Sequence, residues 1–433
     1  MADAGDLEHG NIEDLNVQLL LDSTQKVENP VNQHQPCIFM ISSDFSPRVV
    51  SIGPLHRNDN NLLPFEEQKA IYMRDLLKRF DGPREDILRR CFQMMNADDN
   101  ISKIRACYNT MNTYYSDDNL ARMMVMDACF ILEFLHKLSS KSPEKDVLIE
   151  RSIAYDLLLV GNQIPFFVLQ DILDCINSSG ENSGCLNSLI IVLVNVVNIF
   201  QSTLDTETLD IKKDNREYRH ILDALHQCYV PLHHVTPTFS LGTPHSAVEL
   251  DRRGVNFKPS NSSGWPMDII LESPSWYFPW AKSTLRMPKL RISGDTELIL
   301  RNMIVYEQSC RDLGCCDYIT SYVTAMDLLI NNAEDVAILA ESEVLVNSMG
   351  SHEDAAKMIN ELGKEAPFTG FVYLSQWERL GELYKRYWPK HIESFKRSYC
   401  KSPWNMFALI AGIMLFVLTV LQTYYTVNPI QTK

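Results

Sequence analysis

The sequence predicts a mainly α-helical protein with a large helical body, a small β-containing or irregular insertion, and one C-terminal transmembrane helix. Apolar residues recur at helical spacing up to about residue 230 and again after about residue 292. The segment between them, about 231–292, is rich in Pro, Ser, Gly and Trp and contains short strand-like runs. The run from Met406 to Leu421 is mostly apolar and uncharged. These observations predict a helical body that is interrupted by the insertion and is followed by the transmembrane helix.

Size and composition narrow the range of functions. The chain has 433 residues, enough for one large or two ordinary domains, and a net charge of −15. That charge disfavours a nucleic-acid or other polyphosphate partner. Only 17 residues are Gly, and neither of the phosphate-binding motifs GxxxxGKS/T and GxGxxG occurs in the sequence. We therefore expect no nucleotide and no other cofactor.

An acidic segment, residues 1–35, begins the chain. It has seven acidic residues and one lysine before Pro30. A secretory signal needs a basic start and an apolar stretch, and this segment has neither. We expect a flexible tail with a short helix over 15–21.

The first helix of the body is predicted to begin at Pro64, because proline suits the first helical position. Glu66 and Glu67 then fall in the first turn, where the helix dipole favours anions. Tyr72 and Leu76 recur at a spacing of four residues, as one face of a helix requires. The two glutamates therefore have a structural role in this interpretation.

Further helices are predicted in the first half of the chain, at about 84–95, 101–115, 120–138, 147–160, 165–176, 186–203 and 216–229. The stretch 186–203 is apolar enough to be mistaken for a second membrane span. It is amphipathic, because at 100° per residue an arc of about 120° contains Asn187, Asn195, Asn198, Gln201 and Ser202. We predict that it is a core helix.

The insertion contains three strand-like runs, at 255–258, 267–271 and 289–292. Helical periodicity then returns at 295–308, 317–340, 352–365 and 375–400. The last of these helices is rich in aromatic and basic residues, and we expect it to run towards the membrane. The whole of 36–400 is interpreted as one helical domain.

The transmembrane helix is predicted over residues 404–425 and is followed by a short tail, 426–433. From Trp404 to Tyr424 is twenty helical steps, about 30 Å, which matches the hydrocarbon thickness of a bilayer. Aromatic residues at both ends suit the headgroup level. The predicted anchor consists of Trp404, Met406, Phe407, Leu409, Ile410, Ile413, Leu415, Phe416, Leu418, Leu421, Tyr424 and Tyr425. The alternative is a helix buried in the protein core.

The flanking charges predict the orientation. A basic membrane flank precedes the helix and contains one acidic residue, Glu393. Its basic residues are Lys385, Arg386, Lys390, Lys396, Arg397 and Lys401. By the positive-inside rule, the body faces the cytosol and the protein crosses the membrane once; we expect the plasma membrane. The Asn-x-Ser sequons at Asn100, Asn177 and Asn261 would then stay unglycosylated. The 11 cysteines would be mostly reduced.

Candidate catalytic and metal-binding residues have weak sequence support. Asp127 lies in an apolar helical pattern, where a backbone donor or a distant arginine is the usual partner, and His56 lies near Glu66. A group of potential metal ligands consists of His226, Cys228, His233 and His234. Their spacing matches no recognised zinc site. Cys310, Cys315 and Cys316 also match no zinc pattern. We predict no catalytic residue and no metal site.

Seven ordered stretches carry a resemblance to a known family. They begin with SIGPLHRNDNNLLPFEEQKAIYM and MMVMDACFILEFL, continue through DLLLVGNQIPFFVL, SAVELDRRGVNFK, LRMPKLRISGDTELILRNMIVYEQ and VTAMDLLINNAEDVAIL, and end with PW before the apolar tail. The sequence resembles the plant family called domain of unknown function 247 over roughly residues 36–425. It departs from the family pattern at Gly161, where Glu is usual, and at Met287, where Ile is usual.

The resemblance implies a plant-specific, mostly helical protein with a C-terminal anchor and no established enzymatic activity. Some grass members of the family resemble pollen-side determinants of self-incompatibility. We expect a membrane-anchored interaction or recognition protein without catalytic activity, whose partners are the lipid bilayer and an unidentified protein, with self-association through Ala408 and Gly412 as a further expectation. The alternatives are an extracellular self-incompatibility determinant and an enzyme with an unfamiliar active site.

Overall fold

The computed structural model describes residues 36–39, 46–80, 82–108, 115–140, 147–177, 186–200, 218–231, 238, 240–241, 243–260, 265–273, 282–310, 317–366, 370–385 and 403–427. The predicted tail 1–35 with its short helix, the final residues 428–433, and the basic flank beyond Lys385 lie outside these residues.

One half of the body is built around a long buried helix, α5 (Asp117–Ser139). Its N-terminus is capped by the Ser116 hydroxyl, which accepts a hydrogen bond from the Asn119 N–H. Nearly every side chain from Leu120 to Leu135 is buried. Helices pack around it on several sides, namely α2 (Phe65–Leu77), α3 (Arg84–Met95), α4 (Asp98–Ala106), α7 (Phe166–Ile176) and α8 (Leu186–Val197).

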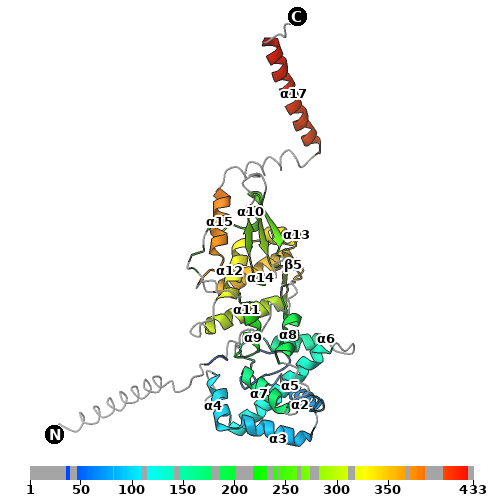
Figure 1. The fold of residues 1–433 in the computed structure, drawn as a ribbon, viewed down its shortest axis with the longest axis vertical. Helices are drawn as coiled ribbons and strands as arrows, with labels where there is room; N and C mark the ends of the chain where they lie inside the picture. Colours follow the sequence, from blue (N-terminus) through cyan, green and yellow to red (C-terminus); the bar gives the residue numbers. More distant parts are fainter. Residues whose placement is uncertain are drawn as a thin grey trace, which may run out of the picture.

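Two shorter helices complete this half and lead into the other one. Helix α6 (Val147–Asp156) packs on α8, and α9 (Ile221–Cys228) lies between the two halves of the elongated body (Figure 1). The second half contains α10 (Ala247–Arg252), α11 (Gly294–Ser309), α12 (Tyr318–Leu329), α13 (Ala333–Glu341), α14 (His352–Glu365) and α15 (Leu374–Lys385). One continuous apolar core runs through both halves.

Two small sheets lie in the second half. The first has the order β1-β3-β2, with β1 (Val255–Pro259) parallel to β3 (Ser283–Met287) and β2 (Ile270–Glu272) antiparallel to it. The second pairs β4 (Leu290–Ile292) with β5 (Leu345–Asn347) in parallel. Apolar side chains on alternate positions of β1 and β3 face the core.

The predicted fold class is confirmed: the protein is mainly helical, has small sheets whose strands, apart from β5, lie in the predicted insertion, and has one apolar helix near the C-terminus. Helices α3 and α14 have the predicted bounds. Several other helices are shorter than predicted. Helix α8 ends at Val197 because Phe200 pairs with Leu290 in an antiparallel bridge. Helix α9 begins after His220, whose side chain caps it by accepting a hydrogen bond from the Asp223 N–H.

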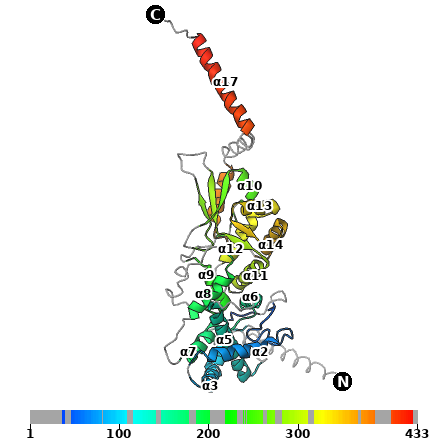
Figure 2. The ribbon, with the colours of Figure 1, turned by 90° about the vertical axis from the view of Figure 1, so that its right-hand side faces the viewer.

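The last helix, α17 (Pro403–Val427), projects from the far end of the body in both views (Figures 1 and 2). It stands beyond α15 and beyond the sheet β1-β3-β2, at the opposite end of the molecule from α3. The residues of the predicted anchor therefore lie on an element separate from the packed core.

Candidate functional site

Helix α17 is the first candidate site, because it is apolar and exposed. The window Phe407–Tyr424 has a mean hydropathy of 2.1, and 0% of it is buried. None of its 25 residues is charged. At 1.5 Å per residue the helix is roughly 37 Å long, enough to cross the hydrocarbon core of a bilayer. A core helix of a soluble protein would instead be mostly buried.

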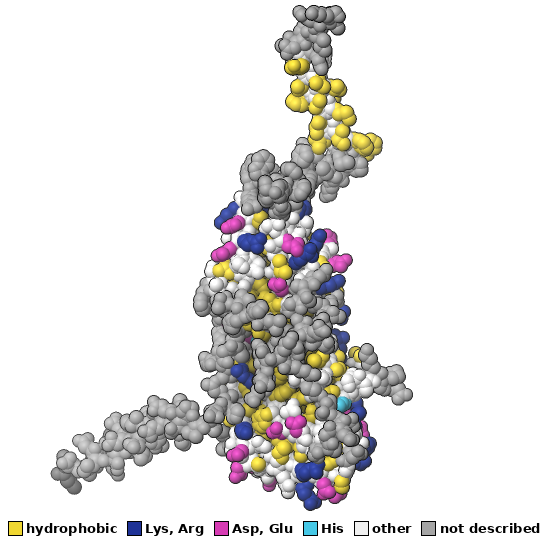
Figure 3. All heavy atoms as spheres, viewed as in Figure 1, with side chains coloured by type: hydrophobic (Ala, Val, Ile, Leu, Met, Phe, Trp, Pro, Cys, Tyr) yellow, Lys and Arg dark blue, Asp and Glu magenta, His cyan; other side chains and the backbone are white. Residues whose placement is uncertain are grey.

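Exposed apolar side chains cover several faces of α17 rather than a single stripe. Phe407, Leu415, Phe416 and Leu418 each expose 60% or more of their surface. The space-filling view shows hydrophobic atoms along the exposed helix, whereas charged residues are interspersed over the body (Figure 3). A helix that is hydrophobic all round is typical of a membrane span. The side chains of Met406 and Tyr425, which belong to the predicted anchor, lie outside the described residues.

Three threonine side chains of α17 are hydrogen-bonded within the helix itself. The hydroxyls of Thr419, Thr423 and Thr426 each donate to the carbonyl four residues earlier, at 2.8, 2.8 and 2.6 Å. Such bonds need no water, so these threonines can lie in hydrocarbon at low cost. Sequence reasoning missed this feature, although threonine at a spacing of four is visible in the sequence.

Aromatic residues lie near both ends of the helix. Trp404 exposes 81% of its surface and Tyr424 exposes 60%. Of the basic flank, the structure describes Lys385, which is exposed at the end of α15. The other five basic residues fall in the stretch 386–402, which is not described.

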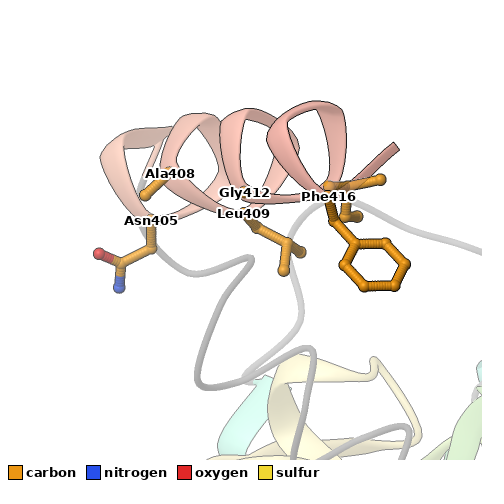
Figure 4. A pocket seen from close by; sticks show the side chains of 6 residues that line it. Asn405, Ala408, Leu409, Gly412 and Phe416 are labelled. Carbon is orange, nitrogen blue, oxygen red and sulfur yellow. The ribbon is translucent and has the colours of Figure 1, made fainter. Parts of the chain in front are cut away.

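One face of α17 is shallow, because small residues lie along it (Figure 4). Ala408 and Gly412 are on this face with Asn405, Leu409 and Phe416. A Cβ atom added to Gly412 would meet no heavy atom within 4 Å. The predicted small-residue pair is therefore on the surface of the helix.

A buried polar cluster surrounds Asp127, one of the candidate catalytic residues. Its carboxylate accepts from Lys69 Nζ at 2.6 Å and from the Gly53 N–H at 2.8 Å, and both charged side chains are fully buried. Lys69 also donates to the Ser51 carbonyl and lies 2.8 Å from Glu66. Burial raises the pKa of Asp127, while Lys69 opposes that shift. The cluster joins α2, α5 and the turn before α2.

The sequence analysis expected a backbone donor or a distant arginine as the partner of Asp127. The backbone donor is present, but the charged partner is a lysine, Lys69, 58 positions away in the chain. Glu66 and Glu67 occupy the first turn of α2, as predicted. Glu66 also forms an ion pair with Arg57, and this arrangement holds the turn 51–57 onto the helix.

His56, the other candidate catalytic residue, is buried beside this turn. Its Nδ1 atom lies 3.0 Å from Asp59. A Cβ atom on Gly161 would come within 3.3 Å of His56 Nε2 and of the Phe39 carbonyl. Gly161, which stands where the family pattern has Glu, therefore packs its backbone directly on His56. A larger residue at this position would require the His56 ring to move.

A second buried polar cluster joins α9 and α11. His226 Nε2 lies 2.8 Å from Glu307, whose carboxylate accepts from the N–H groups of Ile319 and Thr320, both at 2.8 Å. Tyr306 donates to Asp223 at 2.8 Å. These groups connect the two halves of the body and are held by charge-assisted hydrogen bonds.

Of the four potential metal ligands near α9, for which the sequence analysis predicted no metal site, the structure describes two. His226 faces Glu307, and the Cys228 thiol donates to the Ala224 carbonyl at 3.2 Å. His233 and His234 lie outside the described residues. Among the described residues, no group of three or more His, Cys, Asp and Glu side chains could hold a metal ion.

Two of the three sequons lie in the described part of the chain. Asn100 is inside α4, half-buried, and its amide donates to the Met94 carbonyl at 2.9 Å. Asn177 is the C-cap of α7 and is half-buried. Acceptor asparagines are usually on surface loops. The position of Asn100 therefore disfavours its glycosylation in the folded protein.

Comparison with known proteins gives a family match. The model of the family DUF247, described as a plant protein of unknown function, matches residues 35–418. The UPF0481 protein At3g47200 of Arabidopsis thaliana is 26% identical over 425 residues, covering 89% of this chain and 85% of that protein. The putative UPF0481 protein At3g02645 of the same plant is 24% identical over 476 residues, covering 88% and 86%. No solved structure matches the chain.

Proposed function

The chain belongs to the DUF247 family of plant proteins, and we propose that it is a membrane-anchored interaction protein that presents its helical body at a membrane surface. The observation that carries this proposal is the exposed apolar surface of α17. Leaving that surface in water is unfavourable by roughly 25 cal/mol per Å². Insertion into a bilayer removes this surface from water, and the backbone hydrogen bonds of a helix are made within the helix itself.

The charge of the protein supports anchoring by a span rather than by adsorption. The chain carries a net charge of −15, which repels it from anionic lipid surfaces. The basic flank attracts such lipids at about 1 kcal/mol per cation, but only within a Debye length of the surface. Membrane association should therefore persist in 1 M salt, where the flank is screened.

The proposed orientation places the body in the cytosol, at the plasma membrane. The positive-inside rule supports this orientation, because the basic flank precedes α17 and Lys433 is the single charged side chain after it. The half-buried, hydrogen-bonded position of Asn100 agrees with a body that is not exposed to the glycosylation machinery. An extracellular recognition role of the self-incompatibility type would require the opposite orientation.

A non-catalytic role is proposed because the candidate catalytic residues already have structural partners. Asp127 is paired with Lys69 and His226 is paired with Glu307 in separate clusters. Each pair joins elements that are distant in sequence, which is a sufficient reason for its presence. The partner of the body is then another protein, bound through the surface rather than transformed.

Truncation before α17 tests the anchor. A chain ending at Pro403 should remain folded and should lose membrane association in vesicle flotation, whereas the full chain floats with the vesicles. Circular dichroism of the truncated chain checks that the body keeps its helices. Flotation of the truncated chain to the same extent as the full chain would contradict the proposal.

A point substitution with a matched control separates the anchor from other apolar surfaces. Leu415→Arg puts a charge near the middle of α17, which costs about 2.5–3.5 kcal/mol of insertion free energy. Leu148→Arg makes the same change on α6, where Leu148 is also exposed, at 77%. The first variant should float less and the second should float like the wild type. Equal flotation of both variants would count against α17 as the anchor.

A further inference from the structure

Two cysteines that are distant in sequence lie side by side in the half of the body that is built around α5. The Cys37 N–H donates to the Cys107 carbonyl at 3.0 Å, and the Ile38 N–H donates to the same oxygen at 3.0 Å. Ile38 and Tyr108 form an isolated parallel bridge. Cys37 and Cys107 are therefore neighbours in the same parallel register, one position before the bridge.

This register brings the two thiols together. The two N–H groups bond to the carbonyl of Cys107, the C-cap of α4, so the backbones of Cys37 and Cys107 lie directly against each other. A disulfide requires backbones this close, because it joins residues whose Cα atoms are about 4.4–6.8 Å apart. The two side chains are close enough to interact with each other through a hydrogen bond. Both residues are unpaired thiols here.

The hydrogen bond makes the two thiols chemically different. It lowers the pKa of Cys107, because the donated hydrogen stabilises the Cys107 thiolate. The same bond, together with burial, raises the pKa of Cys37. The thiolate is the form that attacks a disulfide. On this basis Cys107 is assigned as the first nucleophile and Cys37 as the resolving thiol; the same disulfide forms whichever of the two thiols attacks first.

We propose that Cys37 and Cys107 are a redox-active thiol pair that closes to an intramolecular disulfide by exchange with a low-molecular-weight disulfide such as oxidised glutathione. The Cys107 thiolate attacks one glutathione sulfur, the S–S bond of glutathione breaks, and one glutathione thiolate leaves. Cys37 then loses its proton and attacks the Cys107 sulfur of the mixed disulfide, which releases the second glutathione. Two protein thiols are oxidised and one glutathione disulfide is reduced to two thiols.

The location of the pair gives the reaction a structural consequence. Cys37 is at the start of the described body, and Cys107 follows the last residue of α4, so the bond would close a loop between positions 70 residues apart. Cys37 is 4% exposed and Cys107 is 7% exposed. Exchange therefore requires the segment 36–39 to open, and oxidation would then hold this segment against α4.

The test uses the full chain in detergent, equilibrated with reduced or oxidised glutathione, then unfolded in denaturant and labelled with a maleimide. Oxidised protein should take up two fewer maleimides than reduced protein, and peptide mapping by mass spectrometry should find Cys37 linked to Cys107. Cys107→Ser should abolish this difference. Cys228→Ser is the matched control, because Cys228 is also a buried thiol and bonds to a carbonyl of its own helix; it should keep the difference.

A wild-type protein in which Cys37 links to any other thiol, or in which neither cysteine is oxidised, would overturn the proposal. Detection of glutathione on Cys107 without closure to Cys37 would also overturn it. Mapping is done on the wild type, so the result does not depend on the folding of the variants. Because the reaction needs no bilayer, its outcome is independent of whether α17 anchors the protein.

Discussion

Helices α8 and α17 are both strongly apolar, but they have opposite environments. Helix α8 (Leu186–Val197) buries six apolar residues and exposes Ser188 and Asn195 on its outer face. The window Phe407–Tyr424 of α17 is 0% buried. The comparison shows that apolar content alone does not distinguish a core helix from a membrane span. The arc occupied by polar residues does, because a core helix needs one face that tolerates water.

The two regions also differ in how they satisfy polar groups. In the body, buried polar side chains find partners on distant elements, as Lys69 does with Asp127 and His226 does with Glu307. In α17, the hydroxyls of Thr419, Thr423 and Thr426 bond to their own helix. The buried polar side chains of the body therefore depend on tertiary contacts for their hydrogen bonds, whereas these threonine hydroxyls of α17 do not.

The largest effect on the body is expected from breaking the Lys69–Asp127 pair. Lys69→Met leaves the Asp127 carboxylate buried without its counter-ion, so the free energy of unfolding should fall by about 3–5 kcal/mol in urea denaturation. Lys78→Met is the matched control, because Lys78 is exposed and pairs with Asp75 on the surface; it should cost about 1 kcal/mol or less. Similar losses for the two variants would show that the buried pair is unimportant to the body.

A pair of leucine substitutions tests the comparison of the two helices directly. Leu193→Ala leaves a cavity under α8, where Leu193 is 1% exposed, and should lower the free energy of unfolding by about 2–5 kcal/mol. Leu418→Ala, at a residue that is 60% exposed in α17, should change it by less than about 0.5 kcal/mol. Urea denaturation of both variants in detergent gives the two values. A large loss from Leu418→Ala would mean that α17 packs on the body.

The buried cap of α9 predicts a loss of stability in acid. Burial lowers the pKa of His220 to about 4 from its usual 6.5, so the folded protein favours the neutral ring. Below pH 6.5 the unfolded chain binds a proton at His220 that the folded protein does not bind until about pH 4. The free energy of unfolding therefore falls as the pH drops from 6.5 towards 4, by about 2 kcal/mol at pH 5. His220→Asn keeps a capping side chain without the titrating group, so its stability should change less over this range. Parallel pH profiles of the two proteins would contradict the assignment to His220.

A small effect per residue is expected from the exposed apolar residues of α6. Val147, Leu148 and Ile149 are 70%, 77% and 47% exposed, and together they make an apolar patch on the body. Replacing all three with Ser should alter the free energy of unfolding by no more than about 0.5 kcal/mol per residue and should leave flotation unchanged. Reduced flotation of the triple variant would identify a second membrane contact.

Local patterns made much of the fold predictable from the sequence. Helix α3 and helix α14 follow from their apolar spacing, and α17 follows from its length and lack of charge. The strands β3 and β5 were not predicted, because each is short and is defined by pairing with a strand far away in sequence. The split between α12 and α13 at the capping residue Asn332 was also missed, since the apolar pattern continues across it.

The apolar helix α17 was more predictable than the buried clusters. Its signal is confined to one stretch of sequence, whereas Lys69 and Asp127 are 58 positions apart, and Cys37 and Cys107 are paired only by the fold. Asp127 stood out because it is an acid in an apolar helix, but its partner could not be identified without tertiary structure. The exposure of α17 likewise needed the structure, because composition alone also fits a core helix.

Protease protection on sealed vesicles, with a tag at each end of the full chain, tests the central claim most directly. The account predicts that protease added outside vesicles with exposed cytosolic faces removes the N-terminal tag and the body. A small fragment containing α17 and the C-terminal tag should survive until detergent opens the membrane. Loss of the C-terminal tag from intact vesicles would contradict the claim that α17 crosses the bilayer.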